Sequence, residues 1–311
     1  MRAIRIVSVS LGSSRRNKEV ETELLGVPLK MKRIGVDGKF YRAVEIIQQL
    51  APDVDAIGLG GIDLYLYAGG NRYVIRDALK LKAAAGSTRV ADGSALKNTL
   101  EKEQIEYLVD SHPEVPIKGR KTLIVSSVDR MGMSLALSQV AGEVVFGDLI
   151  FAVGLPIPIR HYATVVNLAK VILPIMTKLP FQVLYPTGKK QEKTKPKHRR
   201  WLQWAEVVAG DFHFIRRNLP EDMSGKVVIT NTTTQEDREL LSDRQLSWLV
   251  TTTPVIDGRS FGANVLEAAI WALIKHFGDA PTEENFRVYL NKLAIKPSVF
   301  QLREGTLEST S

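Results

Sequence analysis

The chain has 311 residues, no cysteine and a formal net charge of +8 at pH 7. This length is sufficient for two domains, and the lack of cysteine excludes disulfides, thiolate metal sites and a cysteine nucleophile. The hydrophobic content of 44% and the charged content of 24% are those of an ordinary globular protein. We expect a cytoplasmic protein that does not cross a membrane, since no segment has the pattern of a signal peptide or a spanning helix.

Most of the positive charge lies in one segment. Gly188–Arg200 contains seven basic residues and one acidic residue, so it accounts for +6 of the total. The segment follows a predicted strand, and no recognised nucleic-acid module accompanies it. We therefore expect a small anionic partner rather than nucleic acid, the alternative being a solvated basic loop.

The first part of the chain alternates strand-like and helix-like segments. The predicted strands are Ile4–Ser10, Leu29–Ile34, Val54–Leu59 and Arg89–Ala91. The predicted helices are Phe40–Leu50, Arg76–Ala85 and Ala95–Val109. Ser111–Gly119 is polar, contains two prolines and is the predicted linker.

The same alternation continues after the predicted linker. Predicted strands are Thr122–Ser127, Glu143–Phe146, Phe181–Tyr185, Val227–Thr230 and Trp248–Thr251. Predicted helices are Ser134–Ala141, His161–Leu179 with a kink at Pro174, Arg200–Val208, Phe261–Phe277 and Glu283–Leu293.

This order of elements predicts an α/β fold with two α/β units and mainly parallel sheets, the second unit being Rossmann-like. The predicted domains are an N-terminal substrate domain over 1–115, a Rossmann-like domain over 119–278, a C-terminal helical return over 279–304 and a disordered tail over 305–311. Parallel sheets bind ligands at the carboxyl ends of their strands. Those ends are rich in Gly, Ser, Thr, Asp and Asn here, which predicts a ligand site, although turns alone also favour these residues.

The stretch from Ser126 to Asp148 has the layout of a dinucleotide-binding unit, with a loop, a helix, a strand and an acidic residue. Gly132 would lie in the phosphate loop and Asp148 would hold the ribose hydroxyls, although the three-glycine fingerprint is missing. Thr187 and Lys189, in the loop YPTGKK, could hold phosphate oxygens. The alternatives are a plain strand–helix–strand unit and a solvated loop.

Three short motifs carry further candidate site residues. In DGSALKN, Lys97 could transfer a proton, with Asp92 and Asn98 beside it; alternatively Asp92 caps a helix and Lys97 faces solvent. Asp211 and His213 would share one side of a strand, with His213 binding substrate or forming structural hydrogen bonds. The histidine spacing supports no metal site.

A third motif, DGRSFG, places an arginine before a predicted helix. Arg259 and Ser260 could bind a carboxylate or phosphate there, because a guanidinium grips such groups with two hydrogen bonds. A turn followed by a helix cap is the alternative.

Strings over nearly the whole chain resemble a bacterial group of quinate 5-dehydrogenase-like proteins within the shikimate/quinate dehydrogenase superfamily. The strings are VSVSLGSS, AIGLGGIDLYL, DGSALKNTLE, VFGDLIFAVGLPIP, LYPTGKKQEK, GDFHFIRR, ITNTTT and TTTPVIDGRSFGANVLEA. The resemblance implies hydride transfer between NAD or NADP and a ring hydroxy acid. It assigns a catalytic Lys–Asp pair to Lys97 and Asp129, and a carboxylate site to Ser8 and Ser10.

The resemblance also makes Asn231 and Thr232 counterparts of a cofactor-binding Asn-Ala-Thr stretch, while the family's glycine-rich GAGG loop is missing. We therefore predict an NAD(P)-dependent oxidoreductase that acts on a small anionic hydroxy acid, with Lys97, Asp129 and Asp92 in catalysis. Asp148 favours NAD over NADP, and a homodimer is a possible assembly. The alternatives are a transferase or lyase acting on a phosphorylated metabolite or nucleotide, and a non-catalytic ligand-binding protein.

Overall fold

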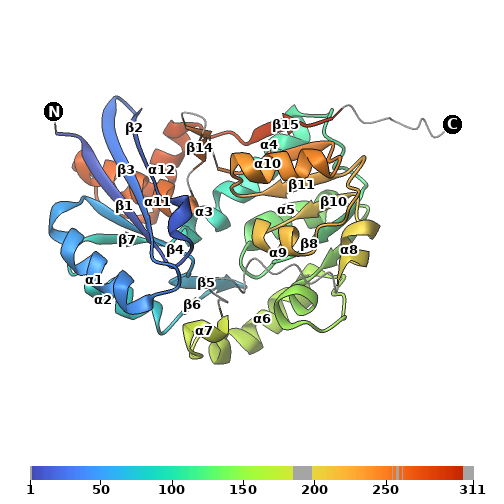
Figure 1. Cartoon of the computed structure of the whole chain (residues 1–311), viewed down its shortest axis with the longest axis horizontal. Helices are drawn as coiled ribbons and strands as arrows, with labels where there is room; N and C mark the ends of the chain where they lie inside the picture. The colour runs from blue at the N-terminus through green and yellow to red at the C-terminus, as the bar shows by residue number, and fades with distance from the viewer. Residues whose placement is uncertain (1, 185–197, 254, 257–258, 261, 304–311) are drawn as a thin grey trace. The chain divides into compact units, whose positions relative to one another are not determined.

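The computed structural model describes residues 2–184, 198–253, 255–256, 259–260 and 262–303. The described chain divides into two compact units (Figure 1). The first unit takes in residues 2–96, 170–184 and 262–295, and the second takes in 97–169, the described part of 198–260, and 296–303. Both units are mixed α/β structures built on mainly parallel sheets, as predicted.

The unit boundary differs from the predicted one at the 111–119 linker. It lies between Leu96 and Lys97, inside a short helix, α3 (Ser94–Asn98). Helix α4 (Leu100–Ser111) packs against α5 (Met131–Val140), and so it belongs to the second unit. The polar linker is therefore a connection within the second unit, and residues 262–295, predicted as parts of other domains, return to the first.

The first unit is built on a five-stranded sheet in the order β2-β3-β1-β4-β7. Its strands are β1 (Ile4–Ser10), β2 (Lys18–Leu24), β3 (Val27–Gly35), β4 (Ala56–Gly60) and β7 (Arg89–Ala91), with only β2 antiparallel to its neighbour. Strand β2 was not predicted, and its residues are mostly charged. A turn at Leu25 and Gly26, both with positive φ, folds it back onto β3. A separate hairpin pairs β5 (Tyr65–Ala68) with β6 (Asn71–Val74).

Helices cover both faces of this sheet. Val7 and Val9 point into a core shared with α1 (Phe40–Leu50) and α2 (Ala78–Ala84). The alternate residues of β1 face the other side, where α11 (Ala263–His276) packs against β1, β4 and β7 and α12 (Glu283–Leu293) packs on α11. Short 3₁₀ turns are η1 (Ser14–Arg16) and η2 (Ala51–Asp53).

The predicted strand Phe181–Tyr185 is wrong over its described part. Phe181–Leu184 forms a short helix, α7, which follows α6 (Tyr162–Met176) and its internal Pro174. The backbone N–H of Phe181 donates to Asp77 Oδ2 at 2.9 Å, and its ring packs against Phe40. These tertiary contacts outweigh the strand propensity of the segment.

The second unit is built on a six-stranded sheet in the order β15-β12-β11-β10-β8-β9. The strands are β8 (Lys121–Ile124), β9 (Glu143–Phe146), β10 (Val207–Ala209), β11 (Val227–Thr230), β12 (Trp248–Thr251) and the antiparallel edge strand β15 (Ser298–Gln301). In chain order the five parallel strands run 2-1-3-4-5, a doubly wound arrangement. The order reverses between β8 and β10.

Two predictions around β10 are wrong. The predicted helix Arg200–Val208 ends early, as α8 (Arg199–Trp204), and β10 follows because its valines pair with β8 and β11. Asp211 and His213, expected to share one side of a strand, instead begin helix α9 (Phe212–Arg217), with Asp211 as its N-cap. Helix α10 (Gln235–Asp243), a π-helical turn η3 (Leu149–Val153) and a small hairpin of β13 (Val255–Ile256) and β14 (Arg259–Ser260) complete the unit.

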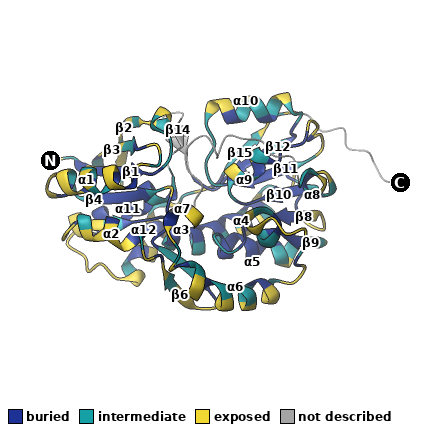
Figure 2. Cartoon of the chain, turned by 60° about the horizontal axis from the view of Figure 1, so that its bottom comes forward, coloured by how far each residue is buried: buried dark blue, intermediate teal, exposed yellow. Residues whose placement is uncertain are grey.

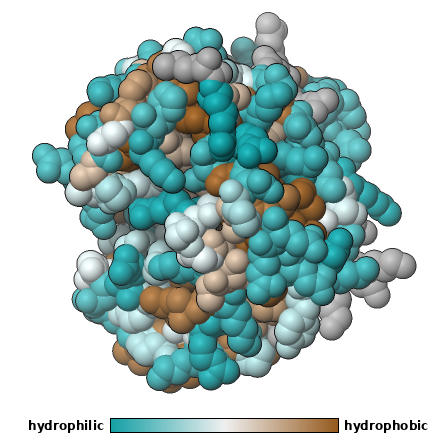
Figure 3. All heavy atoms as spheres, turned by 90° about the vertical axis from the view of Figure 1, so that its left-hand side faces the viewer, coloured by the Kyte–Doolittle hydropathy of each residue, from teal (hydrophilic) through white to brown (hydrophobic). Residues whose placement is uncertain are grey.

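Each unit buries its sheet in an apolar core. Figure 2 shows the strands mostly in the dark blue of buried residues, with exposed yellow residues on helices such as α2 and α10. The face drawn in Figure 3 is largely hydrophilic, with limited hydrophobic areas among the polar ones. In the part of the chain that the structure describes, none of the helices combines the length and the apolar character needed to span a bilayer.

Candidate functional site

The strand order of the second sheet reverses between β8 and β10, and the loops after these two strands lie at that point. In doubly wound sheets, ligands bind at the carboxyl ends of the strands beside such a point. The loop after β8 ends in Asp129 and Arg130, which precede α5, and the loop after β10 contains Asp211. Topology alone therefore makes this edge the candidate site of the second unit.

Lys97 and Asp129 form an ion pair at this edge. Lys97 Nζ donates to Asp129 Oδ1 at 2.6 Å, with 11% of the lysine side chain and 25% of the aspartate side chain exposed. One residue belongs to α3 and the other to the loop after β8, 32 positions later. The structure thus brings together the two residues predicted as a catalytic pair, in a position that is sheltered but still open to solvent.

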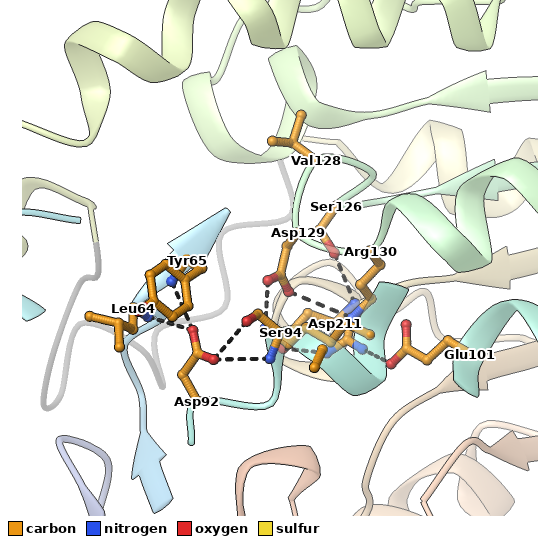
Figure 4. A network of polar contacts seen from close by, with 12 residues as sticks. Leu64, Tyr65, Asp92, Ser94, Glu101, Ser126, Val128, Asp129, Arg130 and Asp211 are labelled. Atoms are coloured by element: carbon orange, nitrogen blue, oxygen red, sulfur yellow. Dashed lines mark hydrogen bonds and ion pairs between the residues drawn. The ribbon is translucent and has the colours of Figure 1, made fainter. Parts of the chain in front are cut away.

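Arg130 is the centre of the cluster and was not among the residues predicted from the sequence. Its side chain is only 1% exposed and lies among three carboxylates (Figure 4). Nη1 donates to Glu101 Oε1, Nε lies 3.7 Å from Asp129 Oδ2, and Nη2 lies 3.6 Å from Asp211 Oδ2. The available signal was an arginine directly after the predicted catalytic Asp129, but its burial and its partners Glu101 and Asp211 depend on distant segments.

Glu101, on α4, is the buried partner of this arginine. Burial raises the pKa of its carboxyl, while the positive charges of Arg130 and Lys97 oppose that rise. Thr252 Oγ1, beyond β12, also donates to Glu101 Oε1 at 3.4 Å. The amide of Gln104, one turn further along α4, is buried without a hydrogen-bond partner among the described residues. The cluster therefore extends through Glu101 to Thr252.

Asp211 links the loops after β8 and β10. Its backbone N–H donates to Ser126 Oγ at 3.0 Å, and its Oδ1 accepts the backbone N–H of His213 at 2.8 Å as the N-cap of α9. His213 is exposed on that helix, and the predicted pairing of Asp211 and His213 on one face of a strand is wrong. Asp211, rather than His213, is the residue that reaches Arg130.

Gly132, predicted to hold a cofactor phosphate, has a different role in the structure. A Cβ at this position would lie 2.9 Å from the carbonyl oxygens of both Lys97 and Asn98. Gly132 therefore allows α5 to approach the backbone of the segment that carries Lys97. Asn98, predicted to bind substrate, contributes its backbone to this close contact.

Replacing Gly132 with alanine is expected to destabilise the protein and to displace Lys97. The added methyl group would press on two backbone carbonyls, and overpacking of this kind costs about 1–3 kcal/mol. Chemical denaturation would measure the loss. Gln139→Ala, an exposed site on the same helix, should change the free energy of unfolding by less than about 0.5 kcal/mol. Equal stability of the two variants would contradict the packing role.

Asp148 follows β9, as predicted, but it faces the loop after β8. Its Oδ1 accepts the backbone N–H of Val128 at 2.9 Å, and its Oδ2 is shielded from solvent. Burial raises the pKa of this carboxyl, against the effect of its hydrogen bonds. Asp148 thus holds the loop that carries Asp129. Its carboxylate bonds the backbone of that loop and Gly132 packs against backbone carbonyls, so neither residue is placed as the dinucleotide prediction expects.

The other predicted binding residues are only partly described. Asn231 follows β11, and its carbonyl oxygen accepts the side-chain hydroxyl of Thr253 at 2.6 Å; Thr232 is partly exposed beside it. Arg259 and Ser260 form β14, but their side chains lie outside the described structure. The predicted phosphate-loop residues Thr187 and Lys189 lie outside the described residues as well.

In the first unit, Asp92 is an internal anchor. Its Oδ2 accepts the backbone N–H groups of Leu64 and Tyr65 at 2.6 and 2.8 Å, and its Oδ1 accepts the N–H and hydroxyl of Ser94 at 3.1 and 2.7 Å (Figure 4). Four donors occupy the two oxygens. Asp92 thus shapes the loop before α3, which differs from the catalytic role predicted for it.

Ser8 and Ser10, predicted to hold a substrate carboxylate, are buried in the same unit. Ser8 Oγ accepts the side-chain amide of Asn264, on α11, at 2.7 Å. Ser10 Oγ accepts Arg33 Nη2 at 2.9 Å and the backbone N–H of Gly12 at 3.1 Å. Both hydroxyl oxygens therefore take part in hydrogen bonds within the unit.

Glu267, on α11, is a second buried carboxyl in the first unit and is expected to make stability depend on pH. Its Oε2 accepts the N–H of Ala95 at 3.0 Å. Burial and the nearby charge of Asp92 raise the pKa of Glu267 from 4.5 to about 8. The folded protein therefore holds an extra proton between these pH values, so stability is highest below this window and falls as pH rises through it.

The slope would reach up to about 1.4 kcal/mol per pH unit. Urea denaturation from pH 5 to about 8.5 would measure it, and Glu267→Gln should flatten the profile because glutamine keeps an acceptor but does not titrate. Glu284→Gln, an exposed change on α12, should leave the slope unaltered. An unchanged profile in Glu267→Gln would contradict the assignment.

Among the described residues there is no group of three or more His, Asp or Glu side chains arranged to hold a metal ion. The cluster around Arg130 instead interleaves two cations with three carboxylates.

Two family models match the chain. A domain of unknown function, DUF8753, matches residues 5–92, and another domain of unknown function, DUF8754, matches residues 95–302, about two thirds of the chain. The chain belongs to the DUF8754 family. The two models meet between residues 92 and 95, close to the boundary between the structural units, and the DUF8754 match also includes α11 and α12 of the first unit.

No curated protein matches the chain. Solved structures that resemble it include a glucose-galactose binding protein from Geobacillus stearothermophilus, with 11% identity, a TM-score of 0.37, and coverage of 99% of this chain and 100% of that one. A sugar transport substrate-binding protein from Bordetella parapertussis 12822 has 10% identity, a TM-score of 0.36 and coverage of 90% and 82%. A glutamate dehydrogenase has 10% identity, a TM-score of 0.37 and coverage of 94% and 78%. These scores are too low to assign a function.

Proposed function

We propose that the chain is an enzyme that binds a small hydroxylated molecule beside β8 and β10 and transfers a proton through Lys97 and Asp129. The contact of 2.6 Å between Lys97 Nζ and Asp129 Oδ1, at the reversal point of a doubly wound sheet, carries this proposal. Both side chains keep some exposure, so a bound molecule could reach them.

The chemistry follows from the two groups. The carboxylate of Asp129 can accept the proton of a substrate hydroxyl, and the ammonium of Lys97 can donate a proton to an oxygen. Because the two groups are hydrogen-bonded, a proton taken up by one can be passed to the other. Positioned acid–base groups of this kind accelerate reactions by about 10²–10⁴-fold.

The charges around the pair favour hydroxyl groups over an anion at this point. Lys97 and Arg130 are already paired with carboxylates, and Asp211 adds a third acidic group that remains 25% exposed. Carboxylates accept hydrogen bonds from hydroxyls. This edge therefore suits the hydroxyl-bearing part of the hydroxy acid that the sequence predicts.

NAD or NADP remains a prediction from the sequence. Gly132 packs on backbone carbonyls and Asp148 is directed to Val128, so the described residues do not fit a dinucleotide in the predicted way. We propose no step through this cofactor. A dehydrogenase is one member of the proposed class of enzymes.

A ligand screen with matched variants tests the proposal. Thermal shifts would be recorded with a panel of small hydroxy and oxo acids and sugars, each alone and with NAD or NADP, and turnover of the hits would be followed by NMR. We expect at least one hit that the wild type converts and that Asp129→Asn binds but does not convert. Dependence of turnover on NAD or NADP would identify a dehydrogenase.

Two results would contradict the proposal. One is turnover that is unaffected by Asp129→Asn and Lys97→Met. The other is binding without turnover under every condition, which would favour a ligand-binding protein without catalytic activity.

A further inference from the structure

Helix α6 is apolar on two opposite sides, one of which is buried and the other exposed. Val165, Ala169 and Leu173, spaced by four residues, form the buried side. Val171 and Ile175 lie opposite, because two steps along a helix turn the side chain by about 200°. They are 69% and 66% exposed, and Figure 2 shows exposed yellow positions along α6. A surface helix of a globular protein usually carries polar residues on this side.

The end of α6 and the helix α7 that follows it are anchored in the first unit. The backbone N–H of Arg76 donates to the carbonyl oxygen of Thr177 at 2.9 Å, and Asp77 Oδ2 accepts the N–H of Phe181 at the same distance. The ring of Phe181 is buried in the core of this unit, whereas Val183 on the same short helix is 65% exposed. The exposed valines and isoleucine are therefore presented by a fixed backbone.

The charges that this part of the chain contributes are all positive. Lys170 and Lys178 are exposed beside the apolar residues of α6, and the sequence contains no Asp or Glu over residues 149–191. Asp77, from the neighbouring segment before α2, is mostly buried and pairs with Lys80 at 3.0 Å. Exposed apolar side chains and lysines thus share one part of the first unit.

This combination fits the surface of an anionic lipid bilayer. Helices that lie on membranes insert apolar side chains at the boundary of headgroups and acyl chains, and their lysines are attracted to anionic headgroups. A second copy of the chain fits less well, because a symmetric contact would place the same lysines against each other. Charge complementarity therefore favours the lipid surface as the occupant.

We propose that the first unit binds anionic phospholipid membranes from the surface through Lys170, Val171, Ile175, Lys178 and Val183. The apolar side chains enter the headgroup region, and the two lysines contact the anionic headgroups. The helix lies along the bilayer surface and does not cross it. This surface is separate from the Lys97–Asp129 pair and does not depend on the proposed function.

Vesicle sedimentation with the full-length protein tests the proposal. The vesicles would contain phosphatidylcholine alone or with about 30% phosphatidylserine. We expect the wild type to bind the anionic vesicles, and added salt to weaken the binding. Val171→Ser combined with Ile175→Ser should weaken it by about tenfold, since the apolar contact is lost. Val288→Ser, an exposed valine on α12, should bind as the wild type does.

The contribution of the lysines is tested with variants of equal charge. Lys170→Gln combined with Lys178→Gln should weaken binding to anionic vesicles by about tenfold. Lys275→Gln combined with Lys292→Gln removes the same charge from exposed positions on α11 and α12. These two helices cover the face of the first sheet opposite to α1 and α2. The second pair of changes should therefore have an effect of about twofold or less, because distant charges are screened.

A single fluorescent label locates the contact without a change in affinity. The chain has no cysteine, so an introduced cysteine is the only site of labelling. An environment-sensitive fluorophore on Ile175→Cys should shift its emission to shorter wavelengths when anionic vesicles are added. The same fluorophore on Val288→Cys should show no shift.

Three results would overturn the proposal. The first is the absence of wild-type binding to anionic vesicles, and the second is equal binding to both kinds of vesicle. The third is equal binding by the double serine variant and Val288→Ser, which would assign the binding to the basic segment 188–200. A dimer that the double serine variant abolishes, found together with no vesicle binding, would make this surface an interface between two copies.

Discussion

Replacing Arg130 with methionine is expected to lower the free energy of unfolding by about 3–5 kcal/mol, the cost of leaving a buried charge without its partner. Arg130 is 1% exposed and Glu101 is buried with it, so the glutamate would lose its main compensating charge. Asp129 and Asp211 would lose a cation at 3.7 and 3.6 Å as well. Urea denaturation, followed by circular dichroism, would measure the loss.

Two comparisons separate this effect from a general loss of charge. Arg120→Met removes an arginine of the same unit whose pair with Glu206 is about 40% exposed, and it should cost no more than about 1 kcal/mol. Adding Glu101→Gln to Arg130→Met should restore part of the stability, because the unpaired charge is removed. A loss below about 1 kcal/mol in Arg130→Met would show that the cluster contributes little to stability.

Replacing Lys97 with methionine is expected to reduce kcat by about 10²–10⁴-fold for whichever substrate the ligand screen identifies. Methionine keeps much of the length of the side chain but cannot donate a proton to substrate or to Asp129. Steady-state kinetics would give kcat and KM, and the free energy of unfolding would be measured in parallel. We expect the loss to appear mainly in kcat, because the pair is proposed to act on the reacting hydroxyl.

The matched control is Lys102→Met on the neighbouring helix α4. Lys102 is partly exposed and pairs with Glu106 at 3.5 Å, away from the contacts of Lys97 and Arg130, so its loss should leave kcat unchanged. If Lys97→Met and Lys102→Met had the same kcat, Lys97 would not be an acid–base group.

These two variants probe one connected cluster from its two sides. Arg130 contacts Asp129, and Asp129 contacts Lys97, so a stability change at one residue bears on the geometry of the others. Mutations this close are not expected to be additive. Stability and activity should therefore be measured on the same preparations.

The local sequence pattern was sufficient to predict those helices and strands whose own residues favour the observed structure. The helical spacing of Phe40–Leu50 and of Glu283–Leu293 predicted both helices with the observed bounds. The apolar runs of Val227–Thr230 and Trp248–Thr251 likewise predicted buried strands correctly. In these segments propensity, hydrophobic pattern and tertiary environment all favour the same structure.

The local sequence pattern gave a wrong secondary structure where contacts with a neighbouring element determine the conformation. Residues 207–209 continue a plausible helix in sequence, but they pair with β8 and β11 as a three-residue central strand. The alternating residues Asp211 and His213 were compatible with a strand, yet the carboxylate of Asp211 caps helix α9. Segments this short gain their structure from the partner rather than from their own residues.

The sequence by itself determined the α/β class and most of the long elements, whereas the Lys97–Asp129 pair was implied only by the resemblance to a dehydrogenase superfamily and its catalytic role stays a prediction. Only the tertiary structure showed that Arg130, Glu101 and Asp211 complete that cluster, and that Gly132, Asp148 and Asp92 serve packing and loop anchoring. It also placed the unit boundary inside α3. The reason is physical: hydrophobic periodicity is a local property, whereas a buried charge is stabilised by groups from distant segments, and their meeting is set by strand order in the sheet.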